Sequence, residues 1–308
     1  MADRKVFYIR HNWKKTEEPD YQKATDHLFE NRQIGVHFDN YQYNIEKYKK
    51  GSDQTSISYM KKCITEEEDI LIVASYLGKD KVYISNPVKD SLDNVSKTIN
   101  QIGKLEIKFL QLSVDNLQEV TIKQFPMPFL SAPPLSTFVQ WDMGKIAVNE
   151  FYDARIRKSG PPKILSGMYS SGQLEVLCEE YLKVTEKGTI VRKLFKTGGG
   201  MKDYDIVGID KHGEYIGAQV KFNCSDKEIN RFINNIELIE NPNNKYFFTS
   251  CKDSEGKPKK GKYFQDGKSL NPTQVISLET VIDYFLEKDR QFLYKLAFGN
   301  DLQQFENQ

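Results

Sequence analysis

The stretch from Asp203 to Lys221 constrains the fold of this chain more than any other segment of its 308 residues. Two runs of β-forming residues, 204–210 and 215–222, are separated by the short polar turn Lys211-His212-Gly213. Such runs around a tight glycine-containing turn are typical of a β-hairpin, in which two strands pair side by side. We therefore expect a hairpin here, within a small sheet.

Polar side chains collect at one end of this hairpin. Side chains alternate between the two faces of a strand, so Asp203 and Asp205 share one face of the first strand. Gln219 and Lys221 share one face of the second strand for the same reason. The alternate positions are apolar or small: Ile206, Gly208, Ala218 and Val220. The alternation predicts that Asp205, Gln219 and Lys221 lie on compatible faces, close together.

The segments around the hairpin predict a compact α/β domain over residues 165–308, with a central sheet flanked by helices. A helix over 171–186 has its apolar residues at helical spacing and carries Glu175 beside them. The remaining expected elements are strands at 189–195, 245–250 and 274–276 and helices at 226–240, 278–287 and 290–304. Because the first helix must cover the sheet, we expect Glu175 to approach the polar end of the hairpin.

The first half of the chain has a different pattern. Residues 1–158 contain short runs of β-forming residues with turn signals between them, which predicts a β-rich domain with a small barrel or a strongly curved sheet. These runs are 6–9, 34–38, 70–74, 81–84, 105–109 and 120–122. A basic cluster followed by Ser-Gly-Pro-Pro ends this half, so residues 159–164 are expected to be a linker.

Composition narrows the class of protein. Hydrophobic residues make up 39% and charged residues 28% of the chain, as in ordinary soluble globular proteins. No apolar run approaches the roughly 18 residues that a membrane span needs, and the segment 1–5 is polar, so we expect neither a membrane partner nor secretion. The formal net charge is +1 and both halves are balanced, so any basic surface for nucleic acid must be local.

The cysteines indicate a reducing compartment. The chain contains four, Cys63, Cys178, Cys224 and Cys251, which are far apart in the sequence and form no Cys-x-x-Cys pair. This spacing is not that of a zinc site, and we expect free thiols and a cytoplasmic protein.

The residue types at the polar end of the hairpin suit metal-assisted cleavage of a phosphodiester. A hard cation such as Mg²⁺ prefers oxygen ligands, so Asp205 is expected to bind it directly and Gln219 to offer a weaker amide oxygen. Glu175 restores the negative charge that Gln219 lacks. Lys221 is expected to position or deprotonate the attacking water, or to stabilise charge that develops on the phosphate.

This arrangement resembles the PD-(D/E)XK superfamily, the restriction-endonuclease-like fold, and within it the Mrr-like branch with a Gln-x-Lys motif. The matching segments are Gly172-Gln173-Leu174-Glu175, Gly198-Gly199-Gly200 with Asp203 to Gly208, and Ala218-Gln219-Val220-Lys221. The resemblance covers roughly 165–250 and the closing strand and helices. It implies that Asp205, which directly precedes the hydrophobic strand, is the metal aspartate, with Asp203 as the second choice.

The resemblance implies an endodeoxyribonuclease that uses Mg²⁺, with Mn²⁺ as a substitute, to hydrolyse double-stranded DNA. The layout of a reader domain before a cutting domain is similar to that of a modification-dependent restriction enzyme. One active site cuts one strand, so a homodimer is expected for double-strand cleavage. The catalytic residues implied are Glu175, Asp205, Gln219 and Lys221, of which Glu175, Asp205 and Gln219 would hold the metal.

Residues of both domains are candidates for contacts with DNA. The stretch from Thr137 to Trp141, after a proline-rich segment, resembles PUA-like and EVE-like barrels, which can hold a flipped, modified base between aromatic rings. Trp13 and Trp141 are the candidates for that role. Lys259 and Lys260, in a basic loop of the second domain, are candidates for contacts with the DNA backbone.

Other interpretations remain open at this point. Asp203 and Asp205 also suit a turn or cap, Gln219 and Lys221 also suit an exposed strand face, and most aromatic residues of the first domain also suit its core. Within the nuclease class, the alternative is a defence or repair nuclease whose first domain senses another ligand, such as a nucleotide signal or RNA. A non-catalytic DNA-binding module on a degenerate nuclease fold is the alternative outside it.

Overall fold

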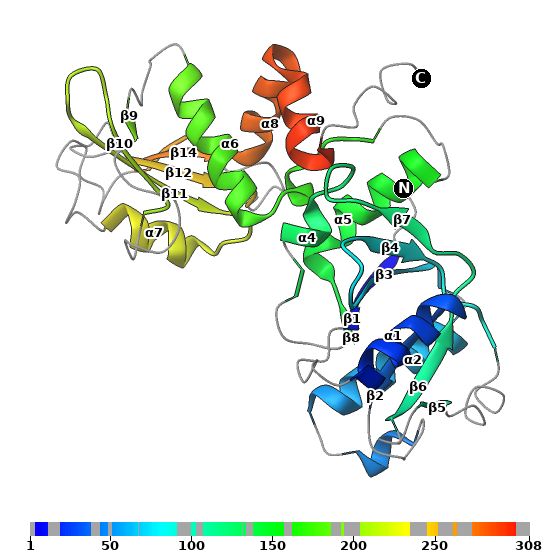
Figure 1. Ribbon diagram of the computed structural model, residues 1–308. Helices are drawn as coiled ribbons and strands as arrows, with labels where there is room; N and C mark the ends of the chain where they lie inside the picture. The colour runs from blue at the N-terminus through cyan, green and yellow to red at the C-terminus, as the bar shows by residue number, and fades with distance from the viewer. Residues whose placement is uncertain are drawn as a thin grey trace. The chain divides into compact units, whose positions relative to one another are not determined.

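The chain forms two compact α/β units, seen in a computed structural model (Figure 1). Unit 1 contains residues 1–163 and 297–308, and unit 2 contains residues 164–296. The boundary at 163/164 falls inside the expected 159–164 linker, whereas residues 297–308 group with unit 1 and not with the expected second domain. The structure describes residues 4–11, 19–37, 44–48, 51–66, 68–90, 100–102, 107–130, 132–133, 138–156, 162–185, 192–193, 204–234, 245–251, 261–263 and 273–299.

Unit 1 is built on a mixed sheet of five strands. Their order is β7 (Gln118–Val120), β4 (Val82–Ser85), β3 (Ile70–Tyr76), β1 (Lys5–His11) and β8 (Phe138–Gln140). β1 and β3 are parallel, and the other neighbours are antiparallel. β3 has the sequence ILIVASY with six of its seven residues buried, as expected for a central strand covered on both faces.

A second, antiparallel sheet and several helices complete unit 1. The sheet has the order β2 (Gln33–His37), β6 (Ile107–Ser113) and β5 (Asn100–Ile102). The longer helices are α1 (Pro19–Glu30), α2 (Ser52–Thr65) and α5 (Asp142–Phe151), with short helical segments at η1 (Ile45–Lys47), α4 (Met127–Leu130) and η2 (Tyr152–Ile156). Residues of α1, α2 and both sheets share one core.

The part of unit 1 that the structure describes has two open sheets and no closed barrel, which corrects the expected barrel. It is also less β-rich than expected, because α1 was not anticipated. Only Ala24 and Leu28 of α1 are fully buried hydrophobic residues, four positions apart. Tyr21 and Phe29 are only partly buried, and these few apolar positions among charged and polar residues give a weak helical period in the sequence.

His11 joins the two sheets of unit 1. It is the last residue of β1, and its Nε2 accepts a hydrogen bond from the N–H of Gly35 in β2, while Nδ1 contacts the carbonyl oxygen of Ser75 in β3 at 3.1 Å. These two contacts identify the neutral ring with its proton on Nδ1. The ring is completely buried and stacks on Tyr76. Burial lowers the pKa of His11 from 6.5 to about 4.

Unit 2 has a single mixed sheet of six strands. Their order is β13 (Gly261–Tyr263), β14 (Thr273–Ser277), β12 (Lys245–Thr249), β11 (Tyr215–Lys221), β10 (Ile206–Ile209) and β9 (Arg192–Lys193). β11, β12 and β14 are parallel to one another, and the other pairs are antiparallel. The expected hairpin is confirmed as β10 and β11.

Helices cover both faces of this sheet (Figure 1). On one face, the ring of Tyr181 in α6 (Ser171–Val184) meets Phe248 of β12 edge to face. On the other, Phe232 of α7 (Asp226–Asn234) packs against Phe247 of the same strand. The short turn η3 (Ser166–Met168) precedes α6, and α8 (Leu278–Lys288) and α9 (Arg290–Phe298) follow the sheet. The expected helices and strands of 165–308 are each found within the described residues, but the helix expected over 290–304 ends at Phe298, and the strand β13 was not expected.

The hairpin turn is closed by Asp210. Its Oδ1 accepts hydrogen bonds from the N–H groups of His212 and Glu214, at 2.8 and 2.9 Å. Gly213 adopts φ +82°, which a glycine tolerates at no steric cost. This local chemistry fixes the register in which Ile206 faces Ala218.

Two helical glycines provide a matched test of packing. A Cβ on Gly144 of α5 would lie 2.3 Å from the ring of Trp141, whereas a Cβ on Gly172 of α6 would meet nothing within 4 Å. We expect Gly144→Ala to destabilise its unit by about 1–3 kcal/mol through overpacking. Gly172→Ala should be neutral or stabilise by up to about 1 kcal/mol, because alanine favours the helix. Thermal unfolding of both variants checks this, and equal shifts would contradict it.

The buried His11 predicts a pH dependence of stability. Its pKa is lower in the folded chain than in the unfolded chain, so the unfolded state binds more protons between pH 6.5 and about 4, and stability falls as the pH falls through that window. The loss should approach about 3 kcal/mol near pH 4. Denaturant unfolding at pH 7 and pH 5 measures it, with His11→Gln expected to flatten the difference and His212→Gln, in the exposed turn, expected to leave it unchanged.

Candidate functional site

The candidate site lies where β10 begins and β11 ends. Glu175 comes from α6, whose N-terminus is fixed by a capping box: the Ser170 hydroxyl accepts from the N–H of Gln173, and the Gln173 side chain accepts from the N–H of Ser170. Gln173 also donates to the carbonyl oxygen of Leu296. The second turn of α6 then carries Glu175, half-buried beside the fully buried Leu174.

An electrostatic effect relates Glu175 to Asp205. Cys178 is fully buried and lies one turn after Glu175 on the same side of α6. Burial raises the pKa of the Cys178 thiol far above its ordinary range, and the negative charges of Asp205 and then Glu175 raise it further. Charges act strongly only over short distances, so both carboxylates lie in the neighbourhood of this one thiol.

The register of the hairpin is interrupted at Asp205. Ile206 faces Ala218, yet the N–H of Asp205 also donates to the carbonyl oxygen of Ala218, at 2.9 Å. Two residues of one strand therefore face a single residue of the other, which is a β-bulge. The bulge explains why Tyr204 and Val207, three positions apart, belong to the same apolar cluster under α7.

The bulge corrects the expected arrangement of faces. In a regular strand Asp205 and Gln219 would share a face, but Tyr204 occupies the α7 face and its neighbour Asp205 turns away from it. The Asp205 carboxylate instead lies against the end of β11, where Oδ2 accepts a hydrogen bond from the backbone N–H of Val220 at 2.8 Å. The hydrogen bond therefore brings the Asp205 carboxylate to the backbone of β11 beside Gln219, but the bulge does not place the Asp205 and Gln219 side chains on one face as strand alternation predicted.

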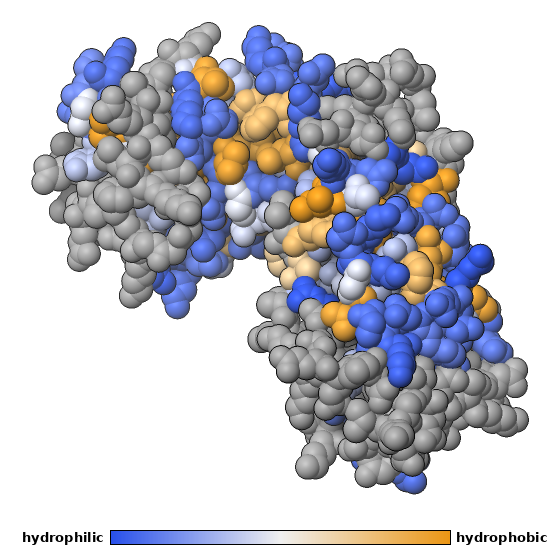
Figure 2. All heavy atoms as spheres, viewed as in Figure 1, coloured by the Kyte–Doolittle hydropathy of each residue, from blue (hydrophilic) through white to orange (hydrophobic). Residues whose placement is uncertain are grey.

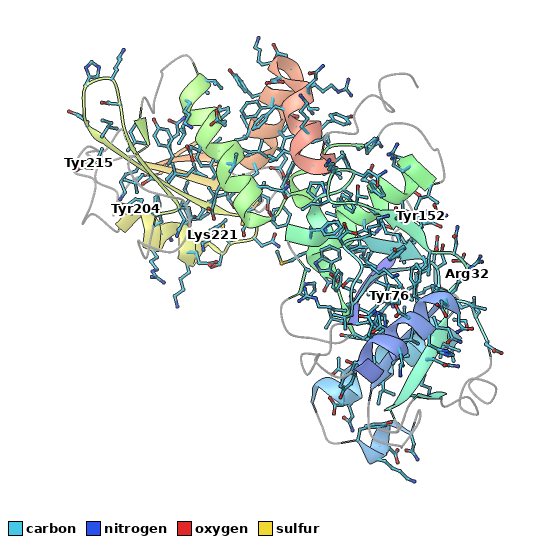
Figure 3. All side chains as sticks on the ribbon, viewed as in Figure 1. Arg32, Tyr76, Tyr152, Tyr204, Tyr215 and Lys221 are labelled. Carbon is cyan, nitrogen blue, oxygen red and sulfur yellow. The ribbon has the colours of Figure 1, made fainter. Side chains whose placement is uncertain are left out.

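Gln219 and Lys221 flank Val220 and are half-buried on the face that α7 covers. Figure 3 labels Lys221 at the end of β11 and Tyr204 ahead of β10. Neither the Gln219 amide nor the Lys221 ammonium makes a hydrogen bond or ion pair within the described ranges. Lys221 acts on α7 electrostatically: hydrogen bonds from Ser225 are the main cause that lowers the pKa of Glu228, and the charge of Lys221 adds to them.

Several candidate residues lie outside the described residues. These are Asp203, the Gly198-Gly199-Gly200 turn, Trp13, Lys259 and Lys260. Trp141 is described and does not suit base stacking, because it is only 3% exposed and its ring packs against Tyr8 and over Gly144. The expected base-stacking role depended only on the pattern of aromatic and polar residues in the sequence, and that pattern does not distinguish a core tryptophan from a surface one.

The candidate metal ligands form a sparse set. Among the residues that the structure describes, no group of three or more His, Cys, Asp or Glu side chains lies close enough together to hold a metal ion. This agrees with the amino-acid types at the site, where only Asp205 and Glu175 are carboxylates and Gln219 is an amide.

A second cluster of polar side chains lies next to Lys221, and no sequence pattern predicts it. Cys224 and Cys251, which are 27 positions apart, have their sulfur atoms 2.8 Å from each other, beside Thr249. All four cysteines are free thiols, as expected. Only the parallel pairing of β11 and β12, in which Lys221 faces Thr249, brings these cysteines together.

No match to this chain emerges from comparisons with models of protein families, with curated proteins or with solved structures. None of the described helices has both the length and the apolar character needed to cross a bilayer. Hydrophilic and hydrophobic residues are mixed over the visible described surface (Figure 2).

Two substitutions of Asp205 distinguish its hydrogen bond to the backbone from the charge of its carboxylate. Asp205→Ala leaves the N–H of Val220 without its acceptor and should destabilise the protein by about 1–2 kcal/mol. Asp205→Asn retains a carbonyl oxygen that can accept this hydrogen bond, so its free energy of unfolding should lie closer to that of the wild type. Chemical denaturation of the three proteins checks the order, and a less stable Asn than Ala variant would contradict the assigned contact.

Proposed function

We propose that unit 2 is the catalytic domain of a Mg²⁺-dependent DNA endonuclease of the PD-(D/E)XK type. The observation that carries this proposal is the hydrogen bond from the Val220 N–H to the Asp205 carboxylate, which brings a carboxylate to the strand segment carrying Gln219 and Lys221. The order of helix, hairpin, helix and parallel strand in unit 2 also agrees with the resemblance found in the sequence.

The available donors suit a cation that needs few protein ligands. Mg²⁺ keeps several of its waters and is usually held by one or two carboxylates together with substrate phosphates. Asp205 and Glu175 would supply two carboxylates and Gln219 an amide oxygen. Within the described residues, Oδ1 of Asp205 takes no hydrogen bond, because the hydrogen bond from the Val220 N–H uses Oδ2. Mn²⁺ accepts the same donors and would replace Mg²⁺.

A bound Mg²⁺ would act as a Lewis acid on a phosphoryl oxygen. The protein's own contribution to the chemistry falls to Lys221. Its ammonium group, half-buried and without an ion pair in the described part of the chain, would hold the attacking water or stabilise the negative charge that develops on the phosphate. Partial burial strengthens such an interaction, since the surroundings screen it less than water does.

The choice of substrate would fall to unit 1. Contacts with phosphates position a protein on DNA without carrying sequence information, so unit 2 alone would cut without selectivity. Unit 1 would therefore recognise double-stranded DNA, with or without a modified base, as in a restriction enzyme. Cleavage of both strands would require two copies of the chain, hence a homodimer. A unit 1 that senses another ligand or RNA would convert the same catalytic domain into a defence or repair nuclease.

A second function is favoured by one observation. The amide of Gln219 stands where a third carboxylate would complete a stronger metal site, and the described residues contain no cluster of three acidic ligands. A protein that binds DNA on this fold without cutting it would not need a third carboxylate at this position.

Plasmid cleavage in Mg²⁺ separates the two functions. We expect wild-type protein to cut, and Asp205→Asn and Lys221→Met to lose on the order of 100-fold or more of the rate, as for other catalytic electrostatic groups. The matched control is Lys227→Met, an exposed lysine on α7, which should cut within a few-fold of wild type. Equal rates for all four proteins would contradict the site. Binding of the plasmid without cleavage by wild type would establish the non-catalytic function instead.

A further inference from the structure

A compact thiol cluster lies at the ends of two parallel strands, next to Lys221. Cys224 follows the end of β11 by three residues, and Cys251 follows the end of β12 by two. Both are half-buried, whereas Cys63 and Cys178 are completely buried in other places. The cluster is thus the one place, among the described residues, where small reagents meet two cysteines together.

The contacts inside the cluster prepare the two sulfurs for a bond. The Cys224 and Cys251 sulfurs are 2.8 Å apart, about 0.8 Å more than the length of a disulfide. The backbone N–H of Cys224 donates to the Cys251 sulfur at 2.8 Å, and the Cys251 thiol donates back to the Cys224 carbonyl oxygen at 2.7 Å. The Thr249 hydroxyl contacts the Cys224 sulfur at 3.1 Å and accepts from the N–H of Cys251 at 3.0 Å.

We propose that Cys224 and Cys251 form a modification site, a dithiol that hydrogen peroxide converts into a reversible intramolecular disulfide beside Lys221. Disulfides in reducing compartments are usually transient and regulatory, and half-exposed ones are the most readily formed and reduced. The bond would close a loop that contains α7 and β12, the two elements that pack around the Gln219 and Lys221 face.

The structure assigns different roles to the two sulfurs. Burial raises the pKa of Cys224 to about 12, so this thiol stays protonated. The Cys251 sulfur accepts a hydrogen bond from the Cys224 N–H, so Cys251 is assigned as the first nucleophile. It attacks one peroxide oxygen, the O–O bond breaks, and the departing hydroxide takes up the proton that Cys251 released.

The second step closes the bond. Cys224 attacks the sulfenic acid on Cys251, the S–O bond breaks, and the oxygen leaves as water with the Cys224 proton. Two thiols lose two electrons in total, and one peroxide becomes two waters. A dithiol reductant reverses the reaction by thiol–disulfide exchange.

The expected consequence for the site rests on the proposed nuclease function. Lys221 faces Thr249 in the sheet, and Thr249 contacts both cysteines. Drawing the sulfurs together pulls the end of β11 toward the end of β12, so it shifts the segment that carries Lys221. A displacement of this size at a catalytic group lowers the rate strongly, because the geometry of the reacting groups is demanding. Oxidation should therefore inhibit cleavage.

Counting free thiols tests the modification without reference to catalysis. The full-length protein is treated with hydrogen peroxide, denatured and labelled with a maleimide, and its mass is measured by mass spectrometry. We expect the four labels of reduced wild type to fall to two after oxidation, with the remaining labels on Cys63 and Cys178 and a peptide in which Cys224 is joined to Cys251. Cys251→Ser lacks one of the two thiols, so peroxide should not remove a pair of its labels through an intramolecular disulfide. Four labels on oxidised wild type, or a bond that involves Cys63 or Cys178, would overturn the proposal.

Plasmid cleavage by the same samples tests the regulation separately. Oxidised wild type should cut at least five-fold more slowly than reduced wild type and recover with dithiothreitol, while Cys251→Ser should be indifferent to both treatments. An unchanged rate in protein that carries the disulfide would overturn the inhibitory role. Reduced wild type that cuts no DNA would refute the proposed nuclease, whereas the thiol count would still decide the modification.

Discussion

The candidate site depends on one contact, the hydrogen bond between the Asp205 carboxylate and the backbone N–H of Val220. β10 begins one residue after Asp205, so it offers no backbone carbonyl oxygen to the Val220 N–H near the end of β11. The Asp205 side chain accepts this hydrogen bond instead. The carboxylate therefore has two functions at once, because it completes the hydrogen bonding of a half-buried strand and presents its second oxygen at the end of the sheet. A hydrogen bond to a charged group contributes about 1.5–3 kcal/mol, enough to hold the side chain in one position.

Much of unit 2 could be predicted from the sequence because its signals are local. The turn at Gly213 and the alternating runs on either side each follow from a few neighbouring residues. The bulge at Asp205 could not be predicted, since it depends on how Tyr204 packs under α7. Counting by twos from Asp205 predicted one shared face with Gln219 and Lys221, whereas the bulge turns Asp205 away from the α7 face on which those two residues lie.

Unit 1 was harder to predict because its helices and sheets are held together by contacts between distant residues. His11 hydrogen bonds to residues 24 and 64 positions away, and no local pattern announces either partner. The same limit applies to Trp141 and to the thiol pair. A tryptophan that was expected to stack on a base proves to be core, and cysteines that are far apart in the sequence prove to be in contact. Both outcomes depend on strand order, which is a property of the whole sheet.

The central claim is that Asp205 and Gln219 hold a divalent cation together. Calorimetric titration of Mg²⁺ in the presence of duplex DNA tests it most directly, with Lys221→Met in every protein so that the DNA stays intact. The account predicts that adding Gln219→Glu tightens Mg²⁺ binding, because a carboxylate is a stronger ligand than an amide, and that adding Asp205→Asn weakens or abolishes it. Identical titrations for the three proteins, or no heat from any of them, would contradict the account.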